Sequence, residues 1–504
     1  MGAIMKSKQE KGMGEISRRN FLKVSAAAGA GVLFAANGLS AKSPLDSDKT
    51  KYALVGTGHR SRMYQEAIYK TFKDNAVMVA LCDLNKGRLT DAQKWCEEDA
   101  GYKPAIYDAK DFDKMIEETN PDFVIVTTIC GTHDKYIVRA MELGRDVITE
   151  KAMTTDENKC QSIVDAQAKT GKKVKVTFNY RYSPPRTQVK DLLMSGVIGD
   201  ILSVDFHWML NTHHGADYFR RWHSRKINSG GLMVHKATHH FDLVNWWLSA
   251  VPVTVQALGK KEFYTPEMAK RFGLESSHQR CLTCPEKSKC GFELDLASNK
   301  YLNDLYLNNE KYDGYYRDQC IFRPEIDIED TMNVMVKYSN NVTLSYSLNA
   351  FNAWEGYYII FNGTKGRLEH KMEEQVYISG DGNIPGQIKS DGTYIKIYPL
   401  RGTAYSVDVW KGEGGHGGGD KLMLEDIFLP GKKNDKYLRA SDQRAGAYSA
   451  LTGIAANHSF VTNKEVVIAD LVKNIGMPEF PPMPSKSEKV PMPSKSVTPK
   501  TKVE

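Results

Sequence analysis

A glycine-rich turn between an apolar strand and a helix constrains the fold most strongly. The stretch KYALVGTGHRS predicts a short strand that runs into Gly56-x-Gly58-x-x-Ser61 and then into a helix. Gly56 lets the chain turn tightly, and Gly58 lets backbone N–H groups approach a pyrophosphate at the start of the helix. Ser61 replaces a third glycine and is still small enough for close packing. The pattern predicts a dinucleotide-binding turn.

The choice of dinucleotide stays open on the sequence. A second strand, VMVALCDLN, reaches Asp83, 27 residues after Gly56. A carboxylate at this place accepts hydrogen bonds from a ribose 2′-hydroxyl and favours NAD. The turn also contains His59 and Arg60, and a guanidinium could hold the 2′-phosphate of NADP.

Strands and helices continue to alternate up to residue 178. Helices are expected near 112–119 and 136–143, between the strands DFVIVTT, DVITEKA and KVKVTFN. This alternation predicts an α/β fold with a doubly wound parallel sheet, a Rossmann domain over residues 50–178. Ligands of such sheets lie beyond the carboxyl ends of the strands. Further candidate cofactor-binding residues at these ends are Thr127, His133, Glu150, Lys151 and Arg181.

The segment SGGLMVHKATHHFDLVNWW, residues 229–247, concentrates histidines in a predicted helix. His235 and His239 are four residues apart and Asp242 follows three residues later, so all three would share one face. Three interpretations compete: a core helix, a metal site that uses the two histidines, and the acid/base end of an active site. The density of polar groups favours the acid/base site.

Other aromatic and basic residues suit a carbohydrate, whose C–H face stacks on rings and whose hydroxyls need fixed donors. The stretch NTHHGADYFRRWHS and the glycine-rich loop GEGGHGGGD contain them. The glycine loop is interpreted either as a linker or as a segment that closes over the pocket. With His235 and Asp242, the candidate substrate-binding residues are His214, Tyr218, Trp222, His223 and His416.

Several segments, in order, resemble one known family. The strand end Glu150-Lys151-Ala152 is similar to the EKP motif of the glucose–fructose oxidoreductase/inositol dehydrogenase family, Gfo/Idh/MocA. The segments TTICGTH, NYRYSPPRTQVKDLLMSGVIGDILSVDFHW, EDTMNVMVKYSNNVTLSYSLNAF and FNGTKGRLE also match, so the resemblance covers about residues 51–471. Ala152 and Thr128 stand where the family usually has proline.

The resemblance implies a second, α+β domain over residues 179–474, with a large, open, mostly antiparallel sheet that covers the nicotinamide and often forms homo-oligomers. It implies that Lys151 and His239 carry out the proton transfers. His235 takes the place of an aspartate in the family's Asp-x-x-x-His-x-x-Asp helix, which adds a titratable group and makes His235 a third candidate catalytic residue.

Four cysteines lie in a predicted insertion, residues 275–322: Cys281, Cys284, Cys290 and Cys320. They are candidates either for one structural zinc ion or for two disulfides formed in an oxidising compartment. The sequence leaves both alternatives open.

The two ends of the chain differ in composition from the domains between them. Residues 1–41 contain Arg18-Arg19 before a short Ala/Gly-rich apolar run, which predicts a Tat export signal rather than a stable membrane anchor. These residues hold six Lys/Arg and two Glu, so they account for most of the net charge of +7. The remainder lacks the concentrated basic face that nucleic acids need. Residues 475–504 repeat PMPSKS and predict a disordered tail.

The sequence as a whole predicts an exported, periplasmic NAD(P)-dependent oxidoreductase that acts on a sugar or glycoside hydroxyl, for example at C3, with a tightly held cofactor. One alternative is a glycoside hydrolase that acts through transient oxidation and elimination. The other is a non-catalytic protein that binds a sugar or a cofactor.

Overall fold

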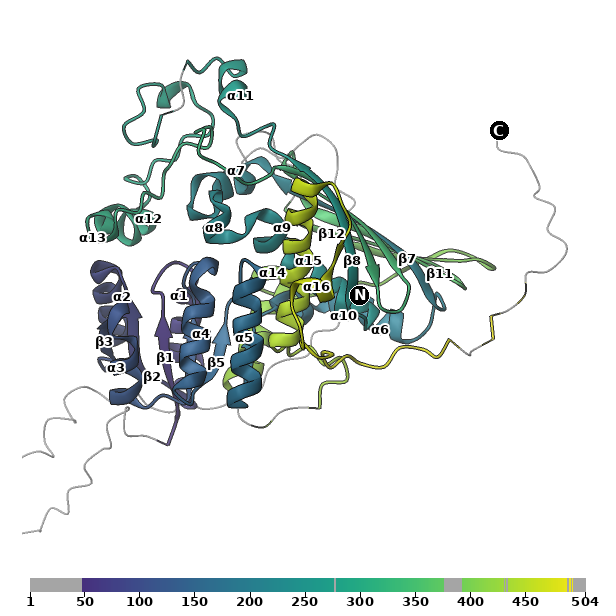
Figure 1. Cartoon of the computed structure of the whole chain (residues 1–504), viewed down its shortest axis with the longest axis horizontal. Coiled ribbons are helices and arrows are strands. Elements are labelled where there is room, and N and C mark those ends of the chain that lie inside the picture. The colour runs from purple at the N-terminus through teal and green to yellow at the C-terminus, as the bar shows by residue number, and fades with distance from the viewer. Residues whose placement is uncertain are drawn as a thin grey trace, which may run out of the picture. The chain divides into compact units, whose positions relative to one another are not determined.

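The glycine turn follows the first strand of a six-stranded parallel sheet with the order β3-β2-β1-β4-β5-β6 (Figure 1). The structure, a computed structural model, describes residues 48–275, 278–375, 392–429, 431, 434–486, 489–490 and 492. The order confirms the predicted doubly wound sheet. Its strands are β1 (Thr50–Val55), β2 (Ala76–Asp83), β3 (Ala105–Asp108), β4 (Phe123–Val126), β5 (Asp146–Thr149) and β6 (Val174–Val176).

Helices cover both faces of this sheet because its strands alternate apolar residues between the two faces. Tyr52 and Leu54 pack with α1, η2 and α2, whereas Ala53 and Val55 pack with α3, α4 and α5. The helices are α1 (Ser61–Glu66), the π-helical turn η2 (Ala67–Thr71), α2 (Lys86–Ala100), η3 (Ala109–Asp111), α3 (Phe112–Thr119), η4 (Cys130–Thr132), α4 (His133–Glu142) and α5 (Glu157–Thr170).

The second sheet has nine strands in the order β14-β13-β12-β11-β7-β10-β9-β8-β15. Its pairs are antiparallel except β7 with β10. Leu344, Tyr346 and Leu348 of β10 alternate toward a buried face. The strands are β7 (Ile201–Asn211), β8 (Pro252–Lys260), β9 (Thr331–Tyr338), β10 (Thr343–Asn352), β11 (Glu355–Gly363), β12 (Gly366–Gln375), β13 (Tyr394–Pro399), β14 (Tyr405–Val407) and β15 (Val466–Val467).

The fully buried α10 contacts α15 in the core of this domain, while the helices of the insertion lie apart from the sheet (Figure 1). The helices of this domain are η5 (Asn179–Tyr182), α6 (Pro184–Met194), α7 (Thr212–Arg220), η6 (Trp222–Ser224), α8 (Lys226–Ser229), α9 (Gly231–His235), α10 (Thr238–Leu248), α11 (Pro266–Arg271), η7 (Lys287–Lys289), α12 (Lys300–Leu305), η8 (Leu307–Asn309), α13 (Glu310–Asp313), α14 (Gly415–Phe428), α15 (Gln443–Thr462) and α16 (Ile468–Leu471). Among the described residues, no helix is long and apolar enough to cross a membrane.

The predicted single helix over residues 229–247 is wrong, because three helices occupy this stretch. α8 ends at Ser229, and Gly230 caps it with a φ of +71°, a left-handed conformation that glycine adopts without strain. α9 ends at His235, and α10 begins at Thr238. His235 and His239 therefore belong to different helices.

Arg181 and Asp242 form a buried ion pair between η5 and α10. Arg181 Nε donates to Asp242 Oδ2 at 2.8 Å and Nη2 donates to Oδ1 at 2.6 Å, and both side chains are 1% exposed. The predictions that Arg181 contacts a cofactor and Asp242 a substrate are thereby corrected. Each buried charge is neutralised by the other, so the pair fixes α10 against the end of the Rossmann domain.

The first part of the predicted tail packs against the second domain. Ser249 Oγ donates to the carbonyl oxygen of Pro481 at 2.7 Å, and Lys190 Nζ lies 3.2 Å from Met483 Sδ. Most of the tail beyond residue 486, like the predicted export signal over 1–41, lies outside the described residues.

Replacement of Asp242 by asparagine should destabilise the fold by about 3–5 kcal/mol, because the Arg181 charge would stay buried without its counter-charge. Urea unfolding measures this effect. The matched control is Asp113→Asn, which breaks the exposed Arg139–Asp113 pair at 2.7 Å and should change stability far less. Equal effects of the two substitutions would show that the buried pair does not hold the fold.

Candidate active site

The glycine turn has the shape that a dinucleotide needs. Gly56 has a φ of +95°, and a Cβ there would lie 2.7 Å from the backbone of Thr127. Thr127 Oγ1 donates to the Gly56 carbonyl oxygen at 2.6 Å and locks this contact. A Cβ on Gly58 would meet nothing within 4 Å, so space remains where a pyrophosphate would approach the backbone. The turn fits the group that its sequence predicts.

Asp83 ends β2 beside this turn. Its Oδ2 accepts hydrogen bonds from the backbone N of Thr57 at 2.6 Å and from Thr57 Oγ1 at 2.9 Å. Its Oδ1 accepts from the backbone N of Asn85 at 2.7 Å. These donors orient the carboxylate toward the end of the strand, where the residues fit the ribose of NAD.

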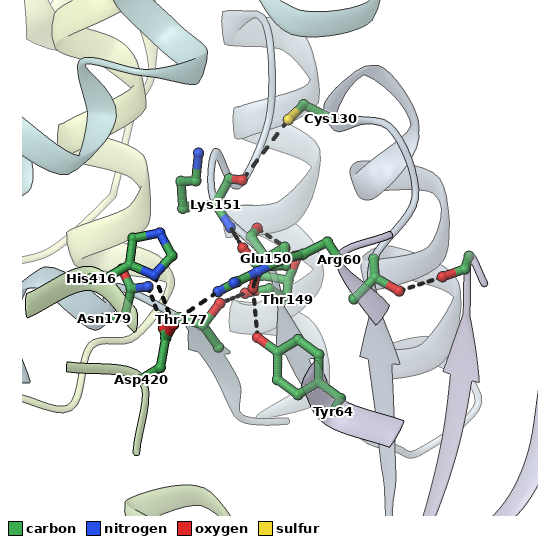
Figure 2. Close-up of polar contacts among 12 residues, drawn as sticks. Arg60, Tyr64, Cys130, Thr149, Glu150, Lys151, Thr177, Asn179, His416 and Asp420 are labelled. Atoms are coloured by element: carbon green, nitrogen blue, oxygen red, sulfur yellow. Dashed lines mark hydrogen bonds and ion pairs between the residues drawn. The ribbon is translucent and has the colours of Figure 1, made fainter. Parts of the chain in front are cut away.

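Arg60, the candidate partner of a 2′-phosphate, pairs with carboxylates that follow β5 and lie in α14. Its Nε donates to Glu150 Oε1 at 2.6 Å, and its Nη2 lies 4.0 Å from Asp420 Oδ1 (Figure 2). Tyr64 Oη donates to the same Glu150 oxygen at 2.7 Å. Burial raises the pKa of Glu150, but Arg60 and Tyr64 outweigh it and keep the pKa below its usual value. Glu150 is therefore an ionised anchor at the end of β5.

His133 braces the loops that follow β4 and β5. Its Nδ1 lies 2.9 Å from the carbonyl oxygen of Ala152, and its Nε2 lies 3.1 Å from that of Thr128. The ring is 1% exposed. The structure thus gives this predicted cofactor residue a positioning role at the two places where the family usually has proline.

Lys151 extends from the end of β5 toward α9. Its Nζ donates to the carbonyl oxygen of His235 at 3.1 Å, and its peptide bond with Ala152 is cis. Burial lowers the pKa of Lys151 to about 8, and the positive charges of Lys236 and Arg60 act in the same direction. An amine with this pKa exchanges protons readily near neutral pH.

His239 lies in the first turn of α10, where the charge of Lys151 acts on it. Its ring stacks on Tyr180 with centroids 4.2 Å apart and an angle of 12°. Its Nδ1 has no hydrogen-bond partner among the described residues. Burial, and then the Lys151 charge, place the pKa of His239 well below 6.5. The imidazole is therefore neutral at physiological pH, and an unpartnered nitrogen can accept a proton.

His235 belongs to a second cluster, formed with side chains of η4, α7 and η6. Its Nδ1 lies 3.3 Å from Cys130 Sγ, and its ring meets His223 with centroids 4.3 Å apart. The rings of Tyr218 and Trp222 lie against it at 5.6 and 5.5 Å. Burial, and then Lys151, lower the pKa of His235 well below 6.5, so this histidine is also neutral.

His214 belongs to the same cluster and connects it to β11. Its ring stacks on Tyr218, and its Nδ1 lies 2.9 Å from Glu355 Oε1. Lys236 Nζ lies 3.6 Å from the same carboxylate oxygen. Glu355 and Lys236 are partners that the sequence did not single out. The available signals were an acid at the start of a largely apolar strand and a lysine between two buried helices.

His416 comes from the glycine-rich loop to the first cluster. Its φ of +53° is left-handed, and its Nδ1 lies 2.7 Å from Asp420 Oδ2. Its ring centroid lies 5.9 Å from Tyr180 and 6.4 Å from His239. The structure thus brings the predicted residues Lys151, His239 and His416 together, with Tyr180 and Asp420 as partners that the sequence did not single out.

The four cysteines of the insertion line one small cavity of about 30 Å³. They are free thiols, and within the described part of the chain no three His, Cys, Asp or Glu side chains are placed to hold one metal ion. The structure therefore does not support the predicted zinc site. Arg220 Nη1 donates to Cys281 Sγ at 3.1 Å, which ties the insertion to α7.

Residues 50–178 match the Gfo/Idh/MocA oxidoreductase family in its NAD-binding Rossmann fold, and residues 190–468 match its C-terminal alpha/beta domain. The chain belongs to this family. Residues 15–35 match the twin-arginine translocation signal sequence, which indicates export by that pathway. Both expectations from the sequence are confirmed.

Two relatives and one solved structure illustrate the breadth of the family. YteT of Bacillus subtilis is 38% identical over 416 residues, which cover 81% of this chain and 95% of the relative. Glycosyl hydrolase family 109 protein 1 of Akkermansia muciniphila is 26% identical over 199 residues, 37% of this chain and 40% of the relative. The aldose-aldose oxidoreductase of Caulobacter crescentus shares the fold with a TM-score of 0.55 at 15% identity, over 83% of this chain and 99% of that one.

Replacement of Lys151 by methionine should stabilise the protein at pH 7 by about 1–3 kcal/mol. Below its folded pKa of about 8 the lysine is a buried cation, which destabilises the folded state. This destabilisation disappears as the pH rises from 8 toward 10.5, the pKa of the lysine in the unfolded chain. The gain should therefore shrink between pH 8 and 10.5 in urea unfolding. Lys94→Met, at a side chain that is 71% exposed, is the control and should show no such gain. A destabilised Lys151→Met at pH 7 would contradict the assignment.

Proposed function

We propose that this protein is an exported NAD-dependent oxidoreductase that oxidises a hydroxyl group of a sugar or glycoside, with C3 of a pyranose as the expected position. One observation carries the proposal: the charge of Lys151, which follows β5, acts on His239, whose Nδ1 has no hydrogen-bond partner among the described residues. The carboxyl edge of a Rossmann sheet is where a nicotinamide binds. Two groups able to accept a proton at that place suit alcohol oxidation.

The chain's own residues handle the proton. When bound, NAD⁺ supplies the acceptor for the hydride that leaves the carbinol carbon. Lys151 in its neutral form, or neutral His239, takes the hydroxyl proton, so that the alcohol becomes a ketone. Glu150 remains ionised through Arg60 and Tyr64 and holds the end of β5, and Tyr180 fixes the plane of the His239 ring.

The second cluster supports a carbohydrate substrate. His214, Tyr218, Trp222 and His223 present aromatic and imidazole faces around His235. Rings of this kind stack on the C–H face of a sugar, and imidazole nitrogens bind its hydroxyls. His416, half-exposed on the glycine loop, would contact the substrate from the other side.

We propose NAD over NADP because the carboxylate of Asp83 lies at the ribose end and Arg60 is occupied by Glu150 and Asp420. Export places the protein where free dinucleotide is scarce. A tightly held cofactor that is recycled between an oxidised and a reduced sugar would not need free dinucleotide. The open nine-stranded sheet is proposed to form homo-oligomers, by analogy with the family.

A second candidate function is glycoside hydrolysis through transient oxidation. Oxidation at C3 acidifies the proton on C2, so that a base can remove it, the C1 leaving group departs, water adds, and the ketone is reduced again. The extra imidazoles of His235 and His223, whose ring centroids lie 4.3 Å apart, favour this candidate because elimination needs a second base. The glycosyl hydrolase relative gives it further support.

Replacement of His239 by asparagine should reduce the rate of substrate oxidation by about 10²–10⁴-fold, the usual loss when a general base is removed. Nucleotide released on denaturation should be unchanged. His458→Asn, at an exposed histidine of α15, is the control. Keto-sugar formation from a panel of glycosides measures the rate. Full activity of His239→Asn would overturn the role of His239, and binding without turnover by the native protein would favour a non-catalytic sugar-binding protein.

Aryl glycosides separate the two catalytic functions. A dehydrogenase should form a keto-sugar and leave the glycosidic bond intact. A hydrolase should release the aglycone with no net formation of NADH. In that case His235→Asn should reduce the rate of aglycone release more than the rate of C3 oxidation. Absorbance of the aglycone and of NADH at their own wavelengths follows both reactions in one sample.

A further inference from the structure

The cysteine-rich insertion reaches across from the second domain to the start of α2 in the Rossmann domain. Figure 1 shows α12 and α13 next to one end of α2, and the contacts of Asn85 and Arg88 identify this end as the start of the helix. Asn85 Nδ2 donates to the carbonyl oxygen of Asn309 at 2.9 Å. Asn309 Nδ2 in turn donates to Asp91 Oδ2 at 3.2 Å. Asn309 is 4% exposed, so this contact is a buried one.

An ion pair adds to this contact close to Asp83, whose carboxylate is expected to bind the ribose. Arg88 Nη2 lies 2.6 Å from Asp313 Oδ2 in α13 and 3.6 Å from Asp83 Oδ1. The Arg88 and Asp313 side chains are 11% and 6% exposed. The one guanidinium near Asp83 in the described residues is thus shared with the insertion, which leaves it poorly placed for a 2′-phosphate.

A third contact reaches the glycine turn itself. His59 Nδ1 lies 2.6 Å from the hydroxyl of Tyr301 in α12. His59 follows Gly58, beside which the pyrophosphate would lie. The insertion therefore touches the Rossmann domain at both segments that surround the adenosine half of a dinucleotide: the turn after β1 and the loop after β2.

The fit between α2 and the insertion is close. A Cβ on Gly87 would lie 1.8 Å from Asn309 Oδ1 and 2.6 Å from the Tyr312 ring. The base of the insertion is equally fixed, because Arg280 Nη2 lies 2.6 Å from Glu310 Oε1 and 2.7 Å from Asp318 Oδ1. Residues 299–313 are thus held by the Rossmann domain on one side and by the base of the insertion on the other.

We propose that residues 299–313 of the insertion are a clamp that closes the adenosine end of the dinucleotide site and makes NAD a resident, slowly exchanging group. The inference rests on the proposed function. A nucleotide seated on Asp83 cannot leave past α2 until Asn309, Asp313 and Tyr301 release their partners. The exchange rate, rather than the chemistry, is therefore the property that the clamp controls.

The experiment uses Gly87→Ala in the full chain, with exchange of bound NAD for isotope-labelled NAD followed by mass spectrometry. Alanine is a better helix former than glycine, so α2 should remain folded while its methyl group displaces Asn309. Gly291→Ala is the matched control in the same insertion, because a Cβ there meets nothing within 4 Å. Asp313→Asn is the second test variant, which breaks the ion pair without added volume.

Native protein and Gly291→Ala should keep their nucleotide through gel filtration. Gly87→Ala and Asp313→Asn should exchange it at least about tenfold faster, while the circular dichroism of all four proteins stays the same. Equal exchange rates in all four proteins would overturn the clamp and leave the proposed function intact. A native protein that binds no NAD, even when NAD is added, would overturn both.

Discussion

Burial of charge at the junction of the two domains is the constraint on which the site depends. Lys151 projects from the sheet edge into a region closed by α9 and α10, and loss of water there lowers its pKa to about 8. The same loss of water keeps His235 and His239 neutral. A domain that buries proton acceptors in this way gives up stability, and such a cost is typical of functional sites.

The remaining charges of this region show which groups serve the fold. Arg60 is satisfied by Glu150, and Arg181 by Asp242, so neither cation is available to a ligand without the loss of its partner. Lys151 differs, because among the described residues its Nζ bonds a neutral carbonyl oxygen and no carboxylate. This contrast separates the group that can change its protonation state from those that must keep theirs.

The sequence predicted the Rossmann sheet well because its signals are local: strand, glycine turn, helix and Asp83 follow each other within 33 residues or so. It failed where the deciding partner is distant. Arg60 turns toward Glu150, 90 residues away, and Asp242 turns toward Arg181, 61 residues away. The break between α9 and α10 was also missed, since His235 and His239 keep helical spacing across it. Spacing alone does not reveal that two residues belong to different helices.

The insertion shows the same limit in another form. Its cysteines form a recognisable sequence pattern, yet Tyr301, Asn309 and Asp313 make the contacts with the Rossmann domain. These residues are unremarkable in sequence, and their partners lie more than 200 residues earlier. Tat export carries proteins that have already folded. A clamp that forms during folding would therefore enclose the dinucleotide before export, while the cofactor is still abundant, so the order of folding and export would itself supply the enzyme with its cofactor.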